Sequence, residues 1–264
     1  MLELYHHGTS VCAAKPRIVL AEKGIKWTGH YVDILAGEQF RPGYMKLNPN
    51  GVVPTLVHNG HVVLESTVIC EYLDEVFPEV PLKPDNARDR AQMRIWTKRI
   101  DEHGHPAVSP ITFAISHRHV VLSNSTQVVE EYIHKLGPAL ADKRRRRLER
   151  GIDDEETRAA LRIWDNFLAD METWLASHPW LAGEHFSLAE ACVLPFLNRL
   201  DMLQLSFMWH DERPAVSAWF DRAKAKPWFE SMLYGFVPPP LRQLMHDKGL
   251  EAVPRARAIL AGAV

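Results

Sequence analysis

Residues 47–66 read LNPNGVVPTLVHNGHVVLES, and this stretch decides the fold. Strand-forming side chains surround Pro54, although proline has no N–H for a sheet ladder and belongs at edges, bulges and strand starts. Asn59-Gly60 is the preferred dipeptide of a two-residue hairpin turn. The stretch therefore predicts two strands, over 53–57 and 61–64, with the proline at the mouth of the first.

Strand and helix signals alternate through the rest of residues 1–80. Strands are expected over 2–6 and 26–32, and a helix over 66–76. Another helix is expected over 16–23, because proline is tolerated in the first turn and Gly24 is a typical helix stop. The order β-α-β, then β-β-α, predicts a small α/β domain with a mixed four-stranded sheet.

Beyond this domain the signals become helical. A proline-rich stretch supplies a linker at 81–88, and an all-helical domain is expected over 89–264. Apolar periodicity predicts helices over 86–115, 155–177, 215–224 and 228–234. The sequence Ser187-Leu188-Ala189-Glu190 is a capping box that opens a further helix.

A long insertion, at about 118–154, separates the two longest predicted helices. It contains a short helical candidate over 126–136 and the basic run Lys143-Arg144-Arg145-Arg146-Arg147. The acidic residues of 153–156 follow shortly afterwards, so the basic run is interpreted as a solvated face whose charge they balance.

Composition excludes several classes of function. The chain has 264 residues and a formal net charge of -2, which argues against a nucleic-acid or anionic-membrane partner. No apolar run is long enough to span a bilayer, and the N-terminus lacks a signal-peptide pattern. The 3 distant cysteines argue for a reducing compartment. The 14 histidines lack partners at metal-binding spacing, so no metal is expected.

Together these features resemble the cytosolic glutathione transferases. NPNGVVPTL is followed at the family's distance by ESTVICEYL, with EKG at 22–24 and the capping box in FSLAEAC. The resemblance covers nearly the whole chain and implies a thioredoxin-like N-terminal domain and an all-helical C-terminal domain. Within the family, ESTVICEYLDEVFPE, RAQMRIWTKRIDE and the arginine-rich insertion are similar to bacterial β-etherases, which cleave lignin-type aryl ethers.

The resemblance implies a glutathione site at the opening stretch. In the family the residue at Pro54 is in the cis form, and the Val53 main chain pairs with the cysteinyl main chain of glutathione. Ser66, expected as a helix N-cap, binds the γ-glutamyl carboxylate with its hydroxyl and amide, and Glu65 pairs with the γ-glutamyl ammonium or fixes the loop. The glycyl carboxylate falls to Gln39, with Lys46 and Arg41 as weaker candidates.

The turn after the first strand is expected to activate the thiol of glutathione. A hydroxyl that donates to sulfur and a helix N-terminus both favour the thiolate. Ser10 matches the active serine of the serine-type branches, Thr9 would serve if the loop is shifted, and Cys12 would instead support disulfide exchange. The etherase branch has an asparagine-serine pair where this chain has Cys12-Ala13, a departure from that pattern.

The electrophile is expected to be small, hydrophobic and aromatic, with an aryl ether as the specific candidate. Its pocket is expected between the domains, with contributions from Arg99, His103 and Phe113. The family implies a cytoplasmic homodimer. The alternatives are a glutathione-dependent thiol reductase that uses Cys12 and a non-catalytic glutathione-binding module.

Overall fold

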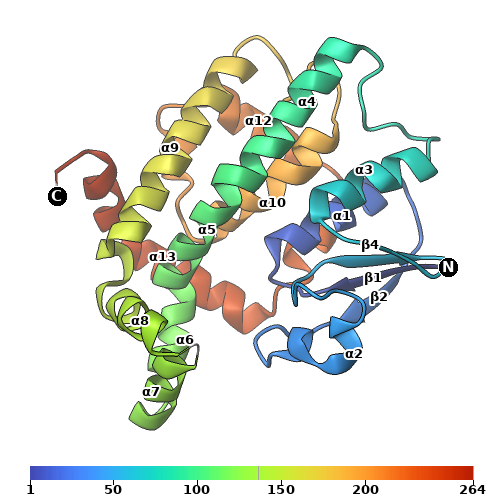
Figure 1. Ribbon diagram of the computed structural model, residues 1–264. Helices are drawn as coiled ribbons and strands as arrows, with labels where there is room; N and C mark the ends of the chain where they lie inside the picture. The colour runs from blue at the N-terminus through green and yellow to red at the C-terminus, as the bar shows by residue number, and fades with distance from the viewer. Residues whose placement is uncertain (136, 264) are drawn as a thin grey trace. The chain divides into compact units, whose positions relative to one another are not determined.

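The computed structural model describes residues 1–135 and 137–263 (Figure 1). The chain folds into two compact units, each assembled from segments that are distant in sequence. The first unit contains Met1–Lys98, Trp174–Leu197 and Ala218–Pro238, and the second contains Arg99–Thr173, Asn198–Ser217 and the residues from Pro239 onward. The predicted division into 1–80, 81–88 and 89–264 stays a prediction.

A four-stranded mixed sheet lies in the first unit, in the order β2-β1-β3-β4. Its strands are β1 (Leu2–His6), β2 (Thr28–Tyr31), β3 (Thr55–His58) and β4 (His61–Val63). β1 is parallel to β2 and antiparallel to β3, and β3 and β4 form an antiparallel hairpin. This is the mixed sheet of a thioredoxin-like domain, as predicted. β2 and β3 are each shorter at their start than expected, since β3 begins at Thr55 and leaves Pro54 outside the ladder.

The hairpin turn is the predicted one. His58 pairs with His61, so Asn59 and Gly60 form the two-residue loop. Both have positive φ, 51° and 84°, which is what a type I′ turn requires and what asparagine and glycine tolerate best. The turn chemistry thus fixes the register of β3 against β4.

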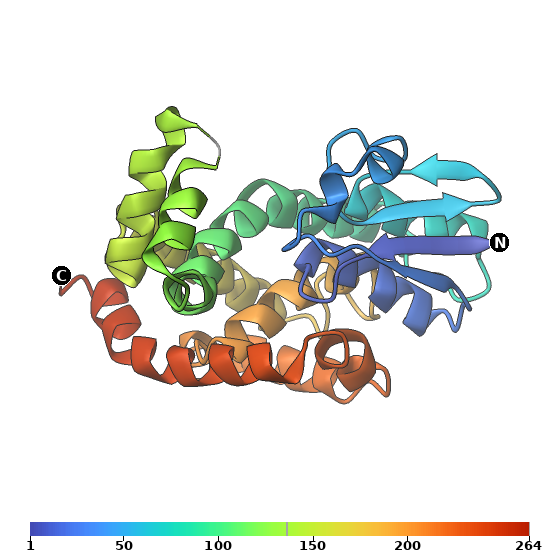
Figure 2. The same ribbon diagram turned by 90° about the horizontal axis from the view of Figure 1, so that it is seen from below.

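Different helices pack against the two faces of the sheet. Leu4 and its cross-strand partner Leu56 are fully buried on one face, and Figures 1 and 2 show α1 (Val11–Glu22) and α3 (Ser66–Val76) on one side of the sheet and α2 (Pro42–Met45) on the other. Because successive side chains of a strand alternate, Tyr5 points to the side opposite Leu4. There its ring centroid lies 6.0 Å from that of Tyr44 in α2.

The prediction for the first helix was wrong at its start. α1 begins at Val11, and Pro16 lies inside it. Ser10 is the N-cap that starts the helix five residues earlier than the proline suggested. Pro16 lacks the N–H that would bond to the Cys12 carbonyl, which removes one ladder bond without ending the helix.

Helices supply the remaining structure. The predicted 86–115 helix is a helical run from Ala87 to Leu122 that includes two π-helical segments: α4 (Ala87–Arg99), η2 (Ile100–Gly104), α5 (His105–Thr112), η3 (Phe113–His117) and α6 (Arg118–Leu122). Pro106 and Pro110 lack backbone donors, so a regular i→i+4 ladder cannot continue through them. The later helices are α9 (Glu155–Leu175), α10 (Leu188–Met202), α11 (Phe207–His210), α12 (Pro214–Lys224), η5 (Glu230–Tyr234) and α13 (Pro239–Leu260).

The insertion is largely helical, which corrects the expectation of a long connection. It contains α7 (Thr126–His134) and α8 (Pro138–Arg150), which contact each other. The predicted helix end at residue 136 lies outside the described residues. α8 carries the basic run on a continuous helix, so its side chains spread around the helix and meet different neighbours.

The capping box before α10 is formed as predicted. Ser187 Oγ accepts from the Ala189 N–H (3.1 Å), and the Glu190 carboxylate accepts from the Ser187 N–H (2.9 Å). Glu190 is fully buried and also accepts from the Leu181 N–H (2.5 Å) and from Nε1 of Trp219 (3.3 Å). Burial raises the pKa of this carboxyl. One side chain therefore joins the 174–197 and 218–238 segments of the first unit.

Candidate active site

Three segments of the first unit meet at one end of the sheet. The register pairs Tyr5, near the end of β1, with Thr55 at the start of β3. It also pairs Leu56 with Val63 at the end of β4. The turn after β1, the residues before β3 and the residues after β4 therefore lie at the same sheet end. These segments carry the predicted residues Ser10, Val53, Pro54, Glu65 and Ser66.

Ser10 is the N-cap of α1. Its backbone is extended, with φ -75° and ψ 116°, and its Oγ accepts a hydrogen bond from the Ala13 N–H at 3.1 Å. The side chain is half-buried. A hydroxyl that accepts through a lone pair keeps its own hydrogen for donation. Ser10 can thus cap the helix and donate to an anion at the positive end of α1 at the same time.

The two rivals of Ser10 have different surroundings. The Thr9 side chain is 8% exposed, and its Oγ1 lies 2.9 Å from Nδ1 of His7. Thr9 is thus turned toward a neighbouring ring. Cys12 is a half-buried cysteine in the first turn of α1. The geometry favours Ser10 over Thr9 as the donor to a ligand.

Beneath this turn lies a buried cation that the sequence reasoning missed. Arg17 is 1% exposed, and its guanidinium donates to the carbonyls of His7 (3.3 Å) and Gly8 (3.5 Å). Burial lowers its pKa to about 9, so the side chain remains charged at neutral pH. These bonds hold two carbonyls of the turn toward the interior. The sequence signal that could have identified this buried cation was the arginine of the Lys15-Pro16-Arg17 stretch in α1.

Aromatic side chains enclose the same arginine. The Phe236 ring lies 4.2 Å from the Arg17 guanidinium carbon and 5.2 Å from the His6 ring. Burial and the Arg17 charge lower the pKa of His6 to about 4. A Cβ at Gly8 would lie 1.9 Å from the Phe236 carbonyl oxygen. Only glycine fits at this position, because the backbone of the 218–238 segment lies against the turn.

The residues before β3 are held by a polar scaffold. The Val53–Pro54 peptide bond is cis, as predicted. Asn48, which is buried, donates to the Val52 carbonyl at 2.9 Å, and the Tyr44 hydroxyl donates to the same oxygen at 2.6 Å. The Asn48 of NPNG thus fixes the approach to the strand, a role that the sequence motif alone did not reveal.

The start of α3 differs from the prediction. Ser66 was expected as the N-cap, but Glu65 holds that position and Ser66 is the first helical residue. Glu65 is exposed and has φ 66°, a left-handed conformation that is uncommon for a residue with a Cβ. This φ reverses the chain from strand to helix, so the cap shifts by one residue. The Glu65 side chain makes no capping bond, which leaves the first-turn N–H groups of the helix without that acceptor.

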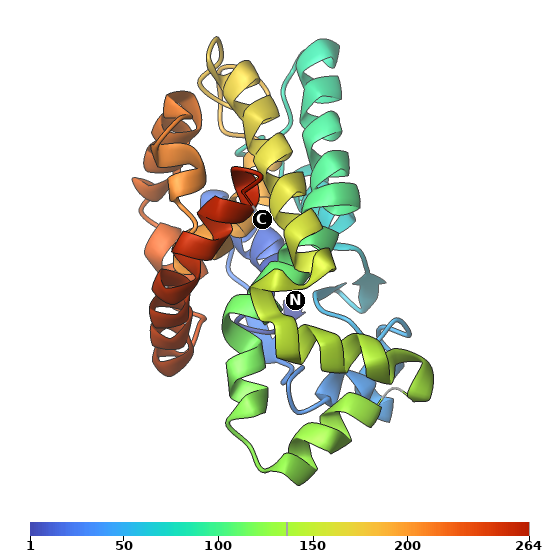
Figure 3. The ribbon, with the colours of Figure 1, turned by 90° about the vertical axis from the view of Figure 1, so that its left-hand side faces the viewer.

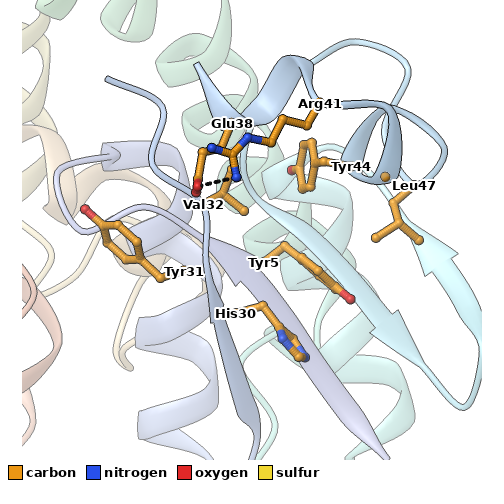
Figure 4. Close-up of a pocket in the computed structure, with 9 residues that line it drawn as sticks. Tyr5, His30, Tyr31, Val32, Glu38, Arg41, Tyr44 and Leu47 are labelled. Atoms are coloured by element: carbon orange, nitrogen blue, oxygen red, sulfur yellow. Dashed lines mark ion pairs between the residues drawn. The ribbon is translucent and has the colours of Figure 1, made fainter. Parts of the chain in front are cut away.

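An open pocket of about 520 Å³ lies at the α2 side of the sheet, and its lining residues include Tyr5, His30, Tyr31 and Tyr44. Figure 4 shows these side chains, together with Arg41, which pairs with Glu38 at 2.8 Å. The candidates for the glycyl carboxylate lie in this region. The Gln39 amide donates to the Ile34 carbonyl at 3.3 Å, whereas Lys46 is exposed.

The predicted acceptor residues have separate neighbours within the second unit. Arg99 forms an ion pair with Asp170 of α9. His103 is exposed on η2. The Phe113 ring is parallel to the Tyr132 ring of α7, with centroids 6.2 Å apart. The side chains of Arg99 and Phe113 therefore face different helices.

Within residues 1–135 and 137–263, no group of three or more histidine, cysteine, aspartate or glutamate side chains is arranged to hold a metal ion. In the same residues, no helix combines the length and the apolar character needed to cross a membrane.

Comparisons with known proteins find matches in both parts of the chain. Residues 9–76 match the family model of the glutathione S-transferase N-terminal domain, and residues 134–227 match that of the C-terminal domain. Protein LigF of Sphingobium sp. strain SYK-6 is 35% identical over 88% of this chain and 92% of its own length. The tetrachloro-p-hydroquinone reductive dehalogenase of Sphingobium chlorophenolicum is 27% identical over 87% of this chain and 94% of its own.

The solved structures add a similar fold. The crystal structure of the β-etherase LigF covers 89% of this chain and 99% of its own, with a TM-score of 0.75 and 34% identity. The identity to LigF and the two matched domain models show more than a shared fold, because they extend over most of the chain. The chain therefore belongs to the glutathione S-transferase family.

Proposed function

We propose that this glutathione transferase binds the tripeptide across the end of the sheet, with its γ-glutamyl group at α3 and its thiol at Ser10. The Val53 N–H and C=O pair with the cysteinyl main chain, as an added strand would. Ser66 and the first-turn N–H groups of α3 hold the γ-glutamyl carboxylate, since a helix N-terminus favours an anion. Glu65 pairs with the γ-glutamyl ammonium.

The glycyl end falls to the α2 region. Gln39 is the proposed donor to the glycyl carboxylate, and Arg41 and Lys46 are the alternatives. Arg41 carries a charge at the rim of the cavity in Figure 4, although Glu38 already pairs with it. A carboxylate from the ligand would compete with Glu38 for the same guanidinium.

Ser10 is the proposed thiol activator. A free thiol has a pKa near ~8.5, and the thiolate is the nucleophile. The Ser10 hydroxyl donates to the sulfur, and the N-terminus of α1 adds a favourable field, so both lower the pKa of the bound thiol. The buried charge of Arg17 lies behind the same turn and acts in the same direction.

The proposed reaction is displacement at an electrophilic carbon of a small, hydrophobic aromatic substrate. The likeness to LigF, described as a β-etherase, supports an aryl ether as that substrate. The C–S bond forms as the C–O bond breaks, and the phenolate leaves with the electron pair and takes a proton from water. The products are a glutathione thioether and a phenol. The roles of Arg99, His103 and Phe113 in holding the acceptor stay predictions.

The observation that carries the proposal is the meeting of the three segments at one sheet end, which is set by the register of β1, β3 and β4. The test is an assay of purified protein with a β-aryl ether whose phenol is fluorescent, run beside a chloro-nitroarene. We expect phenol release that requires glutathione, with one thioether formed per phenol. Phenol release at the same rate without glutathione would contradict the proposal.

A matched pair of variants separates binding from activation. Ser66→Ala should raise KM for glutathione with a smaller effect on kcat, because it removes a contact to the γ-glutamyl end. Thr67→Ala, one residue further on, is the control and should leave KM nearly unchanged. Turnover of the chloro-nitroarene without turnover of any aryl ether would support the proposed transferase activity and refute the aryl ether as its substrate.

We further infer a cytoplasmic homodimer. The exposed apolar side chains of the first unit include Val62 (41%), Val68 (55%) and Ile95 (48%), which we assign to the subunit interface. Burying exposed apolar surface is what stabilises such an assembly. Light scattering after gel filtration should give twice the mass of 30.1 kDa. Val68→Glu should shift the mass toward that of the monomer. A monomer mass for both the unmodified protein and Val68→Glu would refute the inference.

A further inference from the structure

A cavity lies between the helices of the insertion and η3, and none of the residues proposed to bind glutathione lines it. It has a volume of about 230 Å³ and lies in the second unit between η3, α7 and α8, which Figures 1 and 3 show side by side. Six residues line it: Phe113, Tyr132, Leu140, Lys143, Arg144 and Arg147. The four from α8 follow the spacing i, i+3, i+4, i+7, so they share one face of that helix.

The walls combine aromatic rings with guanidinium groups. The Phe113 and Tyr132 rings are nearly parallel, with an interplanar angle of 9°. The Arg147 guanidinium carbon lies 5.0 Å from the centre of Phe113, and that of Arg144 lies 4.9 Å from the centre of Tyr132. Each ring thus positions one cation through its face.

The pairing of the basic run divides it into two groups. Three of its cations have acidic partners. Lys143 pairs with Glu156 at 2.6 Å, Arg145 with Glu130 at 2.9 Å, and Arg146 with the buried Asp154 at 2.8 Å. These pairs include two of the acidic residues of 153–156, which agrees with the charge balance expected from the sequence. The partner of Arg145, Glu130, is not one of the acidic residues of 153–156.

Lys143, Arg144 and Arg147 all line the cavity, but Arg144 and Arg147 differ from Lys143 in their partners. Arg144 donates to the Tyr132 carbonyl at 2.6 Å, which is a neutral acceptor. Arg147 has a buried Nε with no hydrogen-bond partner. Among the described residues, neither has a carboxylate within ion-pair distance. The cavity therefore has two uncompensated positive charges beside an apolar wall, and a buried donor without an acceptor is costly.

We propose that this cavity binds a small aromatic carboxylate. The carboxylate accepts from the Arg147 and Arg144 guanidinium groups, whose planar geometry suits two-point contact with an anion. The ring of the ligand lies against Leu140 and the edges of Phe113 and Tyr132. Pockets for drug-sized ligands measure roughly 300–1,000 Å³, so this smaller cavity is suited to one ring. The site uses none of the residues proposed for glutathione.

The test measures benzoate binding by titration calorimetry on the full-length protein. Removing the Arg147 charge with Arg147→Met, which keeps most of the stem, should weaken benzoate binding about tenfold or more. Arg145→Met is the matched control, because Arg145 is paired with Glu130 outside the cavity, and it should change the affinity by less than about twofold. Equal affinity in Arg147→Met and the unmodified protein would overturn the proposal.

Other probes separate the two parts of the site. Benzyl alcohol, which lacks the charge, and inorganic phosphate, which lacks the ring, should each bind more weakly than benzoate. Phosphate that binds as tightly as benzoate would refute the aromatic part. If Arg147→Met does not fold, as judged by circular dichroism, Arg144→Met tests the same carboxylate contact.

A kinetic arm separates this cavity from the acceptor site. Phe113 lines this cavity and is also one of the residues predicted for the acceptor site, so these two assignments of Phe113 exclude each other. With Phe113 in this cavity alone, benzoate should not compete with the chloro-nitroarene, and its affinity should be the same with and without glutathione. Competitive inhibition would show that benzoate binds at the acceptor site, and the proposal of a separate site would then be wrong.

Discussion

Ser10 allows the sharpest prediction, because its hydroxyl has a structural role and a proposed chemical role that different substitutions separate. The hydroxyl caps α1 by accepting from the Ala13 N–H. Replacing a serine cap by alanine costs about 1 kcal/mol, whereas replacing it by glycine costs only a few tenths. In a protein of this size, about 1 kcal/mol corresponds to a Tm shift of roughly 2–4 °C. Ser10→Ala should therefore lower Tm more than Ser10→Gly.

The chemical role should respond equally to both substitutions. A hydrogen bond to a charged acceptor contributes about 1.5–3 kcal/mol, and one pKa unit corresponds to about 1.4 kcal/mol. Loss of the hydroxyl should thus raise the pKa of the bound thiol by about 1–2 units. At a pH below the pKa of the bound thiol in the unmodified protein, kcat/KM of the variant should be about 10- to 100-fold lower. This difference should shrink as the pH rises.

The assay is the pH profile of kcat/KM with the chloro-nitroarene, together with the ultraviolet absorbance of the bound thiolate. Thr9→Val and Cys12→Ala are the controls, and each should keep the unmodified profile. An unshifted profile in Ser10→Gly would refute the serine mechanism. A shift of the same size in Thr9→Val, or loss of activity in Cys12→Ala alone, would assign the role to that residue.

Three further predictions concern stability. Gly8→Ala should lower the free energy of unfolding by about 1–3 kcal/mol, because its Cβ would meet the Phe236 carbonyl oxygen at 1.9 Å; Gly43→Ala, which meets no atom within 4 Å, is the control in urea unfolding and should not destabilise the fold. His6, with a folded pKa of about 4 against an ordinary 6.5, takes up its proton first in the unfolded chain. Stability should therefore be lost as the pH falls from 6.5 to 4, by about 3 kcal/mol; a slope that persists in His6→Gln would assign the effect elsewhere. Glu190→Ala should cost about 3–5 kcal/mol by leaving buried donors without their acceptor, and a thermal melt within about 1 °C of the unmodified protein would contradict this role.

Local chemistry explains which features could be predicted from the sequence. The hairpin at Asn59-Gly60, the capping box at Ser187 and the succession of strands and helices along residues 1–80 depend on residues close together in the chain, and each was predicted correctly. Local rules failed where two signals competed. Pro16 resembles a helix start, but the serine cap at Ser10 sets the true start. Ser66 resembles an N-cap, but the positive φ of Glu65 moves the cap by one residue.

The sequence by itself determined the family, the four strands of the mixed sheet and the segments that carry the candidate site. Only the tertiary structure decided that Arg17 is buried behind the Ser10 turn and that Gly8 touches a segment more than two hundred residues away. It also decided that Arg144 and Arg147 have no acidic partner among the residues that the structure describes, whereas their neighbours Lys143, Arg145 and Arg146 do. The physical reason is distance along the chain. Turns and caps are set by bonds within a few residues, whereas burial and charge pairing depend on which remote segments pack together.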